Sequence, residues 1–400
     1  MFNLTMSPKS KTKEVKPEVE SFAKIKVIGV GGGGNAAINR MQSDHIKGVE
    51  FVAVNTDAQA LHQNLARTKI HIGKDVTKGL GSGMNPDLGR ESAEESADDL
   101  REILKGADMV FITCGLGGGT GTGAAPVVAE IAHDLGALTV AVVTKPFSFE
   151  GAQRKIIAEK GLEQLIEQVD TIITIPNDRI LQIIDKKTSL LEAFAIVDDV
   201  LKQGVKGIAE LVTVPGLINV DFADVKAVMA DAGSALMGIG RGTGDNRAIE
   251  AAKSAIDSPL LELSIDGARG ILFTIAGSKS LSMNEVNEAA RIITSAADPN
   301  AKIIFGTVID DDMKEELKVT VIATGFGSGN SRARENKAQQ QNAQLDFTPP
   351  IAPPPHKKEP IPQRLIDDAK KIKGRGADSA HEEEKEDELD IPAFIRRKMM

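Results

Sequence analysis

The chain has 400 residues, 41% of them apolar, and this length is more than one hydrophobic core usually organises, so two domains with tails are expected. No apolar run approaches the roughly 18 residues of a membrane-spanning helix, and the polar N-terminus lacks an apolar secretory segment. The single cysteine, Cys114, has no second cysteine to pair with, which predicts a reducing, cytoplasmic compartment.

The charge distribution argues against nucleic acid as the main partner. The formal net charge is −9, and the chain before Ser328 carries 44 acidic against 34 basic residues, whereas binding to phosphodiester backbones requires a basic face. Trp and Tyr are absent, which removes the usual stacking platforms for single strands. The six histidines show no metal-ligand spacing, so we expect no metal site built from side chains.

Residues 1–22 are polar and are expected to be disordered. Five strand-like runs then alternate with helical stretches, at 24–30, 49–54, 107–113, 137–143 and 170–175. These runs are apolar throughout, which is typical of strands buried on both faces of a parallel sheet. The alternation predicts an open α/β sheet of the Rossmann type, with ligands bound beyond the carboxyl ends of the strands.

A long helix is predicted from Leu190 to about Leu211, because apolar residues recur there at three-and-four spacing. After it, strands near 233–239, 268–276, 302–309 and 317–324 surround helices near 221–230, 246–256 and 284–296. We therefore expect one domain over residues 23–211, including the long helix, and a smaller α/β domain over residues 212–326.

The composition after Gly325 changes to Gln, Asn, Pro and mixed charge, which cannot bury a core. Residues 327–386 are therefore expected to form a disordered linker. The final segment, 387–400, combines acids and a proline with apolar Ile391, Phe394 and Ile395 before a basic end. An apolar cluster beyond a polar linker argues against an inert tail.

The first glycine run, Gly29 to Gly34, follows a predicted strand and precedes a predicted helix. Glycine permits positive φ and lets backbone N–H groups approach an anion that the helix N-terminus also attracts. The run also fits the dinucleotide fingerprint GxGxxG, so it indicates a phosphate compound without identifying it. The alternative is a structural turn, which rarely needs four consecutive glycines.

The second run, Gly115 to Gly123, again follows an apolar strand and opens a helix, and its two threonine hydroxyls and many amides suit phosphate oxygens. It contains no lysine, and the chain has no P-loop motif, so a P-loop enzyme is excluded. The phosphate charge must then be offset by amides, the helix dipole and a nucleotide-bound Mg²⁺. A dehydrogenase with one phosphate loop does not need this second run.

A third loop, Gly79 to Pro86, precedes an acid-rich helix. It could close over a terminal phosphate and order only when that phosphate is present. A surface loop in which Asn85 caps the helix and Pro86 takes the first helical position explains the pattern equally well.

The chain resembles the FtsZ family of bacterial tubulin-like cell-division GTPases from about Lys24 to Phe326. The motifs that carry the resemblance are VIGVGGGGNAAINRM, VNTDAQAL, GLGSGMNPDLG, GLGGGTGTGAAP, TKPFSFEG, IPNDRIL and GLINVDFADVK. The stretch GGGTGTG is highly specific to the tubulin-like superfamily. The resemblance implies a tubulin-like fold, in which a long central helix joins a parallel-sheet GTPase domain to a smaller α/β domain with disordered tails.

The resemblance also implies the ligands and partners. These are GTP and GDP, Mg²⁺ bound through the nucleotide, and further copies of the chain in a head-to-tail filament that forms a cytoplasmic division ring at mid-cell. The final peptide resembles the family's partner-binding tail, so residues 387–400 would dock on membrane adaptors and assembly regulators. Residues before Ser21 have no obvious family counterpart and are given no role.

The resemblance assigns roles around the nucleotide. Phosphate contacts would come from Gly32, Gly33, Gly34, Asn35, Gly118, Gly119, Thr120 and Gly121, with Gly81 and Asn85 from the third loop and Ala36 through its main chain only. Glu150 and Arg154 look like ribose and phosphate contacts. Asn177 and Asp198 would read the base, with Phe194 packed on its face. The carboxylate of Asp198 suits guanine, whose N1–H and 2-amino group both donate, although a solvated helix position is the alternative.

Hydrolysis is expected to need a second subunit, because the first domain shows no evident general base. By resemblance, the segment with Asn219, Asp221 and Asp224 is the family's synergy loop, which would act on the nucleotide of the neighbouring subunit. Without the resemblance, Asp221 is a fair N-cap and Asp224 a first-turn acid of the following helix. In a filament, both aspartates would orient and polarise the attacking water.

Two other functions compete with this interpretation. A nicotinamide-dependent dehydrogenase would use Gly29–Gly34, with Asp57 as a weak candidate for the ribose contact, but it leaves GGGTGTG unexplained. A regulator that binds GTP without hydrolysing it is disfavoured, because both Asp221 and Asp224 are present.

Overall fold

The computed structural model describes residues 23–326, apart from residues 45, 47, 183, 186, 215, 262, 263, 311 and 312. The expected disordered N-terminal segment, the linker over 327–386 and the terminal peptide over 387–400 lie outside the described residues. Those that are described belong to one compact unit. No helix within this part of the chain is long and apolar enough to cross a membrane.

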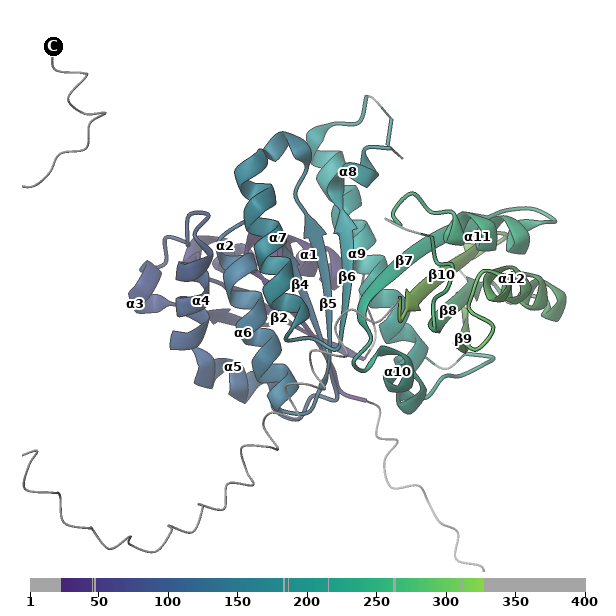
Figure 1. Cartoon of the computed structure of the whole chain (residues 1–400), viewed down its shortest axis with the longest axis horizontal. Helices are drawn as coiled ribbons and strands as arrows, with labels where there is room; N and C mark the ends of the chain where they lie inside the picture. Colours follow the sequence, from purple (N-terminus) through teal and green to yellow (C-terminus); the bar gives the residue numbers. More distant parts are fainter. Residues whose placement is uncertain are drawn as a thin grey trace, which may run out of the picture. The chain divides into compact units, whose positions relative to one another are not determined.

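The first half of the chain forms a parallel sheet with strand order β3-β2-β1-β4-β5-β6 (Figure 1). Its strands are β1 (Ile25–Val30), β2 (Val49–Asn55), β3 (Thr68–His71), β4 (Met109–Gly115), β5 (Leu138–Lys145) and β6 (Thr171–Pro176). Five of the six match the predicted runs within a few residues, and β3 was not predicted. The order reverses between β1 and β4, which pair directly with each other. Ligands of open α/β sheets bind at such a reversal.

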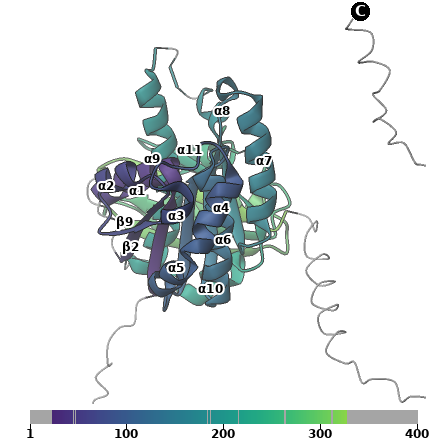
Figure 2. The ribbon, with the colours of Figure 1, turned by 90° about the vertical axis from the view of Figure 1, so that its left-hand side faces the viewer.

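Helices cover both faces of this sheet, as the two apolar cores show (Figure 2). One face carries α1 (Gly31–Ser43) and the long helix α9 (Leu190–Thr213). The other carries α4 (Pro86–Glu95), α5 (Ala97–Leu104), α6 (Thr120–Asp134) and α7 (Ala152–Ile166). Strands buried on both sides explain why their sequences are apolar without alternation.

Helices α4 and α6 approach unusually closely because glycines face the opposing backbone. A Cβ atom built on Gly123 would lie 1.9 Å from the carbonyl oxygen of Pro86, and one on Gly89 would lie 2.4 Å from that of Gly119. Neither space admits a side chain. The start of α6, which carries the second glycine run, is therefore held tightly against α4.

Short helices complete the first half: α2 (Ala58–Gln63), α3 (Lys74–Thr77) and α8 (Asn177–Ile180), with a 3₁₀ turn at Ser148–Glu150. Helix α9 begins with a capping box, in which Ser189 and Glu192 each satisfy the other's backbone N–H. It ends at Thr213, two residues beyond the predicted end. Lys202 of α9 bridges to Asp44 at the end of α1, with 2.6 Å between Nζ and Oδ2, so the two helices are tied together.

The second half adds β7 (Gly233–Gly242), β8 (Gly270–Gly277), β9 (Lys302–Ile309) and β10 (Leu317–Thr324), with α10 (Phe222–Met229), α11 (Arg247–Ile256) and α12 (Met283–Ser295). All seven elements were predicted. Strand β7 pairs with β6 over three residues only and then continues in a mixed sheet of order β7-β10-β8-β9. The domain division at residues 211 and 212 stays a prediction, since the two sheets share this edge.

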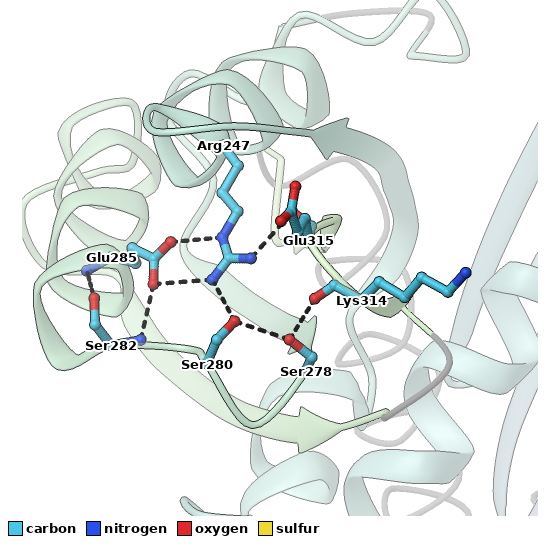
Figure 3. Close-up of polar contacts among 7 residues, drawn as sticks. All are labelled: Arg247, Ser278, Ser280, Ser282, Glu285, Lys314 and Glu315. Carbon is cyan, nitrogen blue, oxygen red and sulfur yellow. Dashed lines mark hydrogen bonds and ion pairs between the residues drawn. The ribbon is translucent and has the colours of Figure 1, made fainter.

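A buried arginine ties the second half together (Figure 3). Arg247 donates from Nε to Glu285 over 2.6 Å, and its terminal nitrogens reach the hydroxyl of Ser280 at 3.1 Å and the carbonyl of Glu315 at 3.0 Å. Hydrogen bonding from the guanidinium lowers the pKa of Glu285, which also caps α12 with Ser282. The network joins α11, α12 and the turn before β10, and its donors and acceptors satisfy one another.

Candidate functional site

A pocket of about 560 Å³ lies at the carboxyl ends of the parallel strands, around the reversal between β1 and β4. It is lined by Val30, Gly32, Gly33, Asn55, Asp57, Ala60, Leu80, Gly81, Ser82, Gly83, Met84, Gly115, Leu116, Gly118, Gly119, Thr120, Gly121, Thr144, Pro146, Glu150, Arg154, Asn177, Phe194, Val197, Asp198 and Leu201. All three glycine loops contribute to it. This is the position that the strand–helix alternation predicted for a ligand.

Two helix N-termini form one side of the pocket. Helix α1 starts at Gly31 and α6 at Thr120, and neither has a side-chain cap on its first turn. Their first N–H groups therefore remain available to an anion, which the helix dipoles also favour. The two turns touch, since a Cβ on Gly31 would lie 2.8 Å from the N atom of Gly121. Glycine is thus required here by the close approach of the first and second glycine runs.

The opposite side of the pocket has amide and carboxylate groups. Asn177 is buried, and its Oδ1 atom has no hydrogen-bond partner among the described residues. Asp198 of α9 lies 3.6 Å from Nε of Arg40, and burial raises its pKa to about 6 although Arg40 opposes the rise. Phe194, one turn before Asp198, is 40% exposed and packs edge-on against Phe147. A buried acceptor, a carboxylate and an open aromatic face suit a planar base with N–H donors.

Glu150 and Arg154 form a hydrogen-bonded pair at the pocket wall. Arg154 donates to Glu150 over 2.8 Å, and Glu150 also accepts from the backbone N–H of Phe147. Both side chains line the pocket. The pair therefore offers one anionic and one cationic group to the polar middle of a ligand, as the predicted ribose and phosphate contacts require.

The structure brings twelve of the predicted nucleotide contacts to the pocket wall and leaves four outside it. Gly34 packs against β4, where a Cβ would lie 2.3 Å from the carbonyl oxygen of Thr113. Asn35 is buried in α1, and both polar atoms of its side chain lack partners among the described residues. Ala36 is exposed. Asn85 accepts from the N–H of Asp87 and caps α4, as the structural alternative for that loop predicted.

Sequence reasoning gave no role to two polar residues at the end of β2, Asn55 and Thr56. Asn55 is buried and accepts from the N–H groups of Thr56 and Asp57. The hydroxyl of Thr56 contacts that of Thr120, and Thr120 in turn contacts Ser82. The signal was the polar run NTD directly after an apolar strand, at the sheet edge where the glycine loops also lie.

The three predicted catalytic residues lie beyond the other end of α9. Asp221 caps α10 by accepting from the N–H of Asp224, as the local pattern predicted, and Asn219 accepts from the N–H of Gly216. All three side chains are exposed, and Leu217 beside them is 70% exposed. None of them belongs to the pocket.

Comparison with known proteins gives consistent matches. Residues 24–185 match the model of the Tubulin/FtsZ family GTPase domain, and residues 233–327 match that of the FtsZ family C-terminal domain. An empty FtsZ dimer from M. jannaschii is 50% identical, with a TM-score of 0.74 over 76% of this chain and 88% of the other. CetZ2 from Haloferax volcanii, solved as a GTPγS-bound protofilament, has a TM-score of 0.66 at 21% identity over 81% of this chain and 100% of the other, and shares the fold.

These matches confirm the tubulin-like fold and the GTPase domain. The structures matched are from M. jannaschii and Haloferax volcanii, so the bacterial origin that the resemblance implies stays a prediction. The match to the M. jannaschii protein covers 76% of this chain, and the two family models match parts of both halves of the described chain. The chain belongs to the FtsZ family of tubulin-like GTPases.

Proposed function

We propose that this GTPase hydrolyses GTP at an active site that a second copy of the chain completes within a head-to-tail filament. The observation that carries the proposal is the length of α9. From Asp198 to Thr213 the helix rises roughly 22 Å. Asp221 and Asp224 follow at the start of α10, after the segment that connects the two helices. Neither Asp221 nor Asp224 lines the pocket of its own subunit, which supports action on the nucleotide of another subunit.

The pocket residues fit a guanine nucleotide. The uncapped starts of α1 and α6 offer N–H groups to the phosphates, and no lysine is needed because amides and helix dipoles offset their charge. Asp198 would accept from the N1–H and 2-amino group of guanine, and the partnerless Oδ1 atom of Asn177 would gain a donor. Adenine has neither of these donors, so it would leave Asp198 and Asn177 unpaired and would bind several kcal/mol more weakly than guanine.

Magnesium would enter with the nucleotide. Among the described residues, no group of three or more His, Cys, Asp or Glu side chains could hold a metal ion. Mg²⁺ usually keeps several waters and is bound through substrate phosphates and one or two protein groups. When bound there it would neutralise charge on the phosphates. A requirement for Mg²⁺ in turnover but not in protein folding would support this assignment, and turnover that survives complete chelation would contradict it.

The catalytic contribution of the second subunit is positioning and charge. Exposed carboxylates at Asp221 and Asp224 would face the terminal phosphate of the neighbour and orient the attacking water. Such an interface joins unlike surfaces and does not close, so it generates filaments. We propose that these filaments form the division ring at mid-cell.

The test is a pair of substitutions in the completing loop. Asp221→Ala and Asp224→Asn should bind GTP as the unmodified protein does and lower turnover about 100-fold or more, since a positioned acid or base commonly contributes that much. Asp257→Asn, which changes an exposed carboxylate at the end of α11, is the matched control and should be silent. Unchanged turnover in either loop variant would show that the aspartates do not act on the nucleotide.

Residues 387–400 are proposed to recruit membrane adaptors and assembly regulators by folding on binding. Their mixture of acids, apolar Ile391, Phe394 and Ile395 and a basic end supports this assignment. Removing the fourteen residues should abolish adaptor binding and spare GTP turnover. Equal adaptor affinity of the shortened and full-length chains would refute it.

A dehydrogenase is not favoured by the site. Asp57, its candidate ribose contact, uses one carboxylate oxygen to cap α2 by accepting from Gln59 and Ala60. The second glycine run, which such an enzyme does not need, forms one wall of the pocket. Competition between GTP and NAD for the pocket separates the two functions.

A further inference from the structure

Three hydroxyl groups from three different loops form a continuous chain beside the phosphate side of the pocket. Thr120 Oγ1, at the start of α6, lies 2.6 Å from Thr56 Oγ1 and 2.8 Å from Ser82 Oγ. Thr56 follows β2 and is fully buried, whereas Ser82 belongs to the loop before α4 and is 5% exposed. Thr120 and Ser82 both line the pocket. The central hydroxyl is therefore in a position to contact a phosphate while it holds the other two.

The backbone of the loop that carries Ser82 is anchored by the N–H of Leu80, which donates to the Thr77 carbonyl, and by that of Gly81, which donates to the Thr56 carbonyl over 3.3 Å. Five residues between positions 78 and 84 have positive φ, namely Lys78, Gly79, Gly81, Gly83 and Met84, and the first and last of these are not glycine. Such conformations are uncommon for residues with a side chain and persist only where surrounding contacts hold them. Leu80 is 87% exposed and Met84 38% exposed. Ser82 is the buried side chain of this segment.

The structure on either side of the loop is fixed. At its first residue, the carbonyl of Gly79 accepts from the N–H of Ala58. After it, α4 is packed so closely on α6 that a Cβ on Gly123 would strike the backbone of Pro86. A Cβ on Gly119 would likewise lie 2.4 Å from Ser82 Oγ and 2.8 Å from the N atom of Asn85. Adjustment to a ligand is therefore confined to the short segment between these anchors, which the Ser82 hydroxyl links to Thr120 of α6.

Proton counting gives the chain of hydroxyls a direction. A threonine hydroxyl has one proton to donate and two lone pairs that accept. A phosphate oxygen only accepts, so Thr120 must give its single proton to the phosphate. Thr56 and Ser82 must then both donate to Thr120. Hydrogen bonds that run in one direction polarise each other, so two donors on Thr120 make it a stronger donor to the phosphate.

We propose that Ser82 is a positioning residue, whose hydroxyl donates to Thr120, strengthens the bond of Thr120 to a nucleotide phosphate and couples loop 79–84 to phosphate occupancy. The inference rests on the proposed function, since it requires that the pocket takes a nucleoside phosphate. In the absence of phosphate the three protons can be arranged in more than one way. Phosphate selects one arrangement and so fixes the loop.

The experiment compares Ser82→Ala and Thr56→Val with Ser92→Ala in the full-length protein. Ser92 is a matched control, because it is fully buried in α4 and donates to the Leu88 carbonyl away from the pocket. Affinity for GDP and for a slowly hydrolysed GTP analogue is measured below the concentration at which the protein assembles, and hydrogen exchange of residues 79–84 is followed with and without nucleotide.

Ser82→Ala and Thr56→Val should each weaken nucleotide binding about three- to tenfold, the effect of one lost hydrogen bond. Ser92→Ala should leave affinity unchanged. Nucleotide should protect the amides of 79–84 in the unmodified protein and the Ser92 variant, and this protection should be lost in Ser82→Ala. If Ser82→Ala binds and protects as the Ser92 variant does, the coupling is wrong although the GTP site stands. If the unmodified protein binds no guanine nucleotide, the proposed function itself fails.

Discussion

Single residues in this pocket combine charge with burial, and Asp198 shows the consequence. Its carboxylate is largely enclosed by α9 and α1, and desolvation raises its pKa to about 6 despite the nearby Arg40 guanidinium. The resemblance to the FtsZ family predicted Asp198 as a base contact, whereas composition alone allowed a solvated helix position. The sequence did not indicate Arg40 as its partner, because the ion pair joins helices that are far apart in the chain.

The raised pKa predicts that GTP binding weakens in acid. The carboxylate must be ionised to accept two guanine N–H groups, so affinity should fall by about tenfold between pH 7 and pH 5 as the carboxyl takes up a proton. Acid has the opposite effect on the folding stability of the free protein. A pKa in the folded state above the ordinary value of 3.8 means that ionised Asp198 opposes folding, and the free energy of unfolding gains from protonation as the pH falls through about 6.

The measurement is nucleotide affinity as a function of pH for three proteins. In Asp198→Asn the component due to this carboxyl should disappear, which leaves only the titration of the phosphates themselves. In Arg40→Met the midpoint should move to higher pH, because a cation that favours the ionised form is lost. Superimposable pH profiles for the unmodified protein and Asp198→Asn would show that Asp198 does not contact the base.

Helices and strands were predicted correctly from the sequence where burial determines the pattern of apolar residues. Strands buried on both faces are apolar throughout, and α9 has a continuous apolar stripe, so both were predicted within a few residues. Strand β3 was missed because its four residues, TKIH, include only one apolar side chain. The helix after the third loop was predicted as one stretch, whereas Ser96 separates α4 from α5.

The contact between α4 and α6 is a feature of elements that no local pattern reveals. Its closeness depends on Gly89 and Gly123, which lie in separate helices and whose role appears only when the backbones meet. Glycine inside a helix costs about 1 kcal/mol relative to alanine. Here the missing side chains of Gly89 and Gly123 allow α4 to approach α6 closely. The third loop therefore reaches the second glycine run, and Ser82 lies beside Thr120.

This packing predicts that Gly123→Ala destabilises the protein even though alanine favours helices. The added Cβ would lie 1.9 Å from the Pro86 carbonyl oxygen and 2.8 Å from the N atom of Arg90, so α4 must move. Overpacking of this kind lowers the free energy of unfolding by about 1–3 kcal/mol. Urea unfolding of the variant measures the loss. Gly118→Ala is the control, since no atom lies within 4 Å of its Cβ position, and equal stability of the two variants would contradict the packing argument.

At the scale of the whole molecule, α9 separates the nucleotide pocket from the loop that would complete catalysis. The sequence indicated both ends of this arrangement, but not the distance between them, which follows from an unbroken helix of 24 residues. If the proposed shared site is correct, specific activity should rise steeply above a threshold protein concentration, because isolated subunits would lack the completing aspartates. Proportionality between rate and concentration down to high dilution would indicate a monomeric enzyme.

The exposed segment before α10, which includes Leu217 and Asn219, offers a sharper test of assembly. Leu217 is 70% exposed next to Asn219 and close in sequence to Asp221, and an exposed apolar side chain there suits a contact between subunits. Leu217→Glu places a charge in that contact, so the threshold concentration for GTP turnover should rise at least tenfold while GTP affinity stays constant. Met283→Glu is the matched control, because Met283 is 76% exposed at the start of α12 and lies outside the proposed catalytic interface. Sedimentation with GTP and turnover at increasing concentration measure both variants. Since neither side chain stabilises a core, a threshold that Leu217→Glu leaves unchanged would place the subunit contact elsewhere on the molecule.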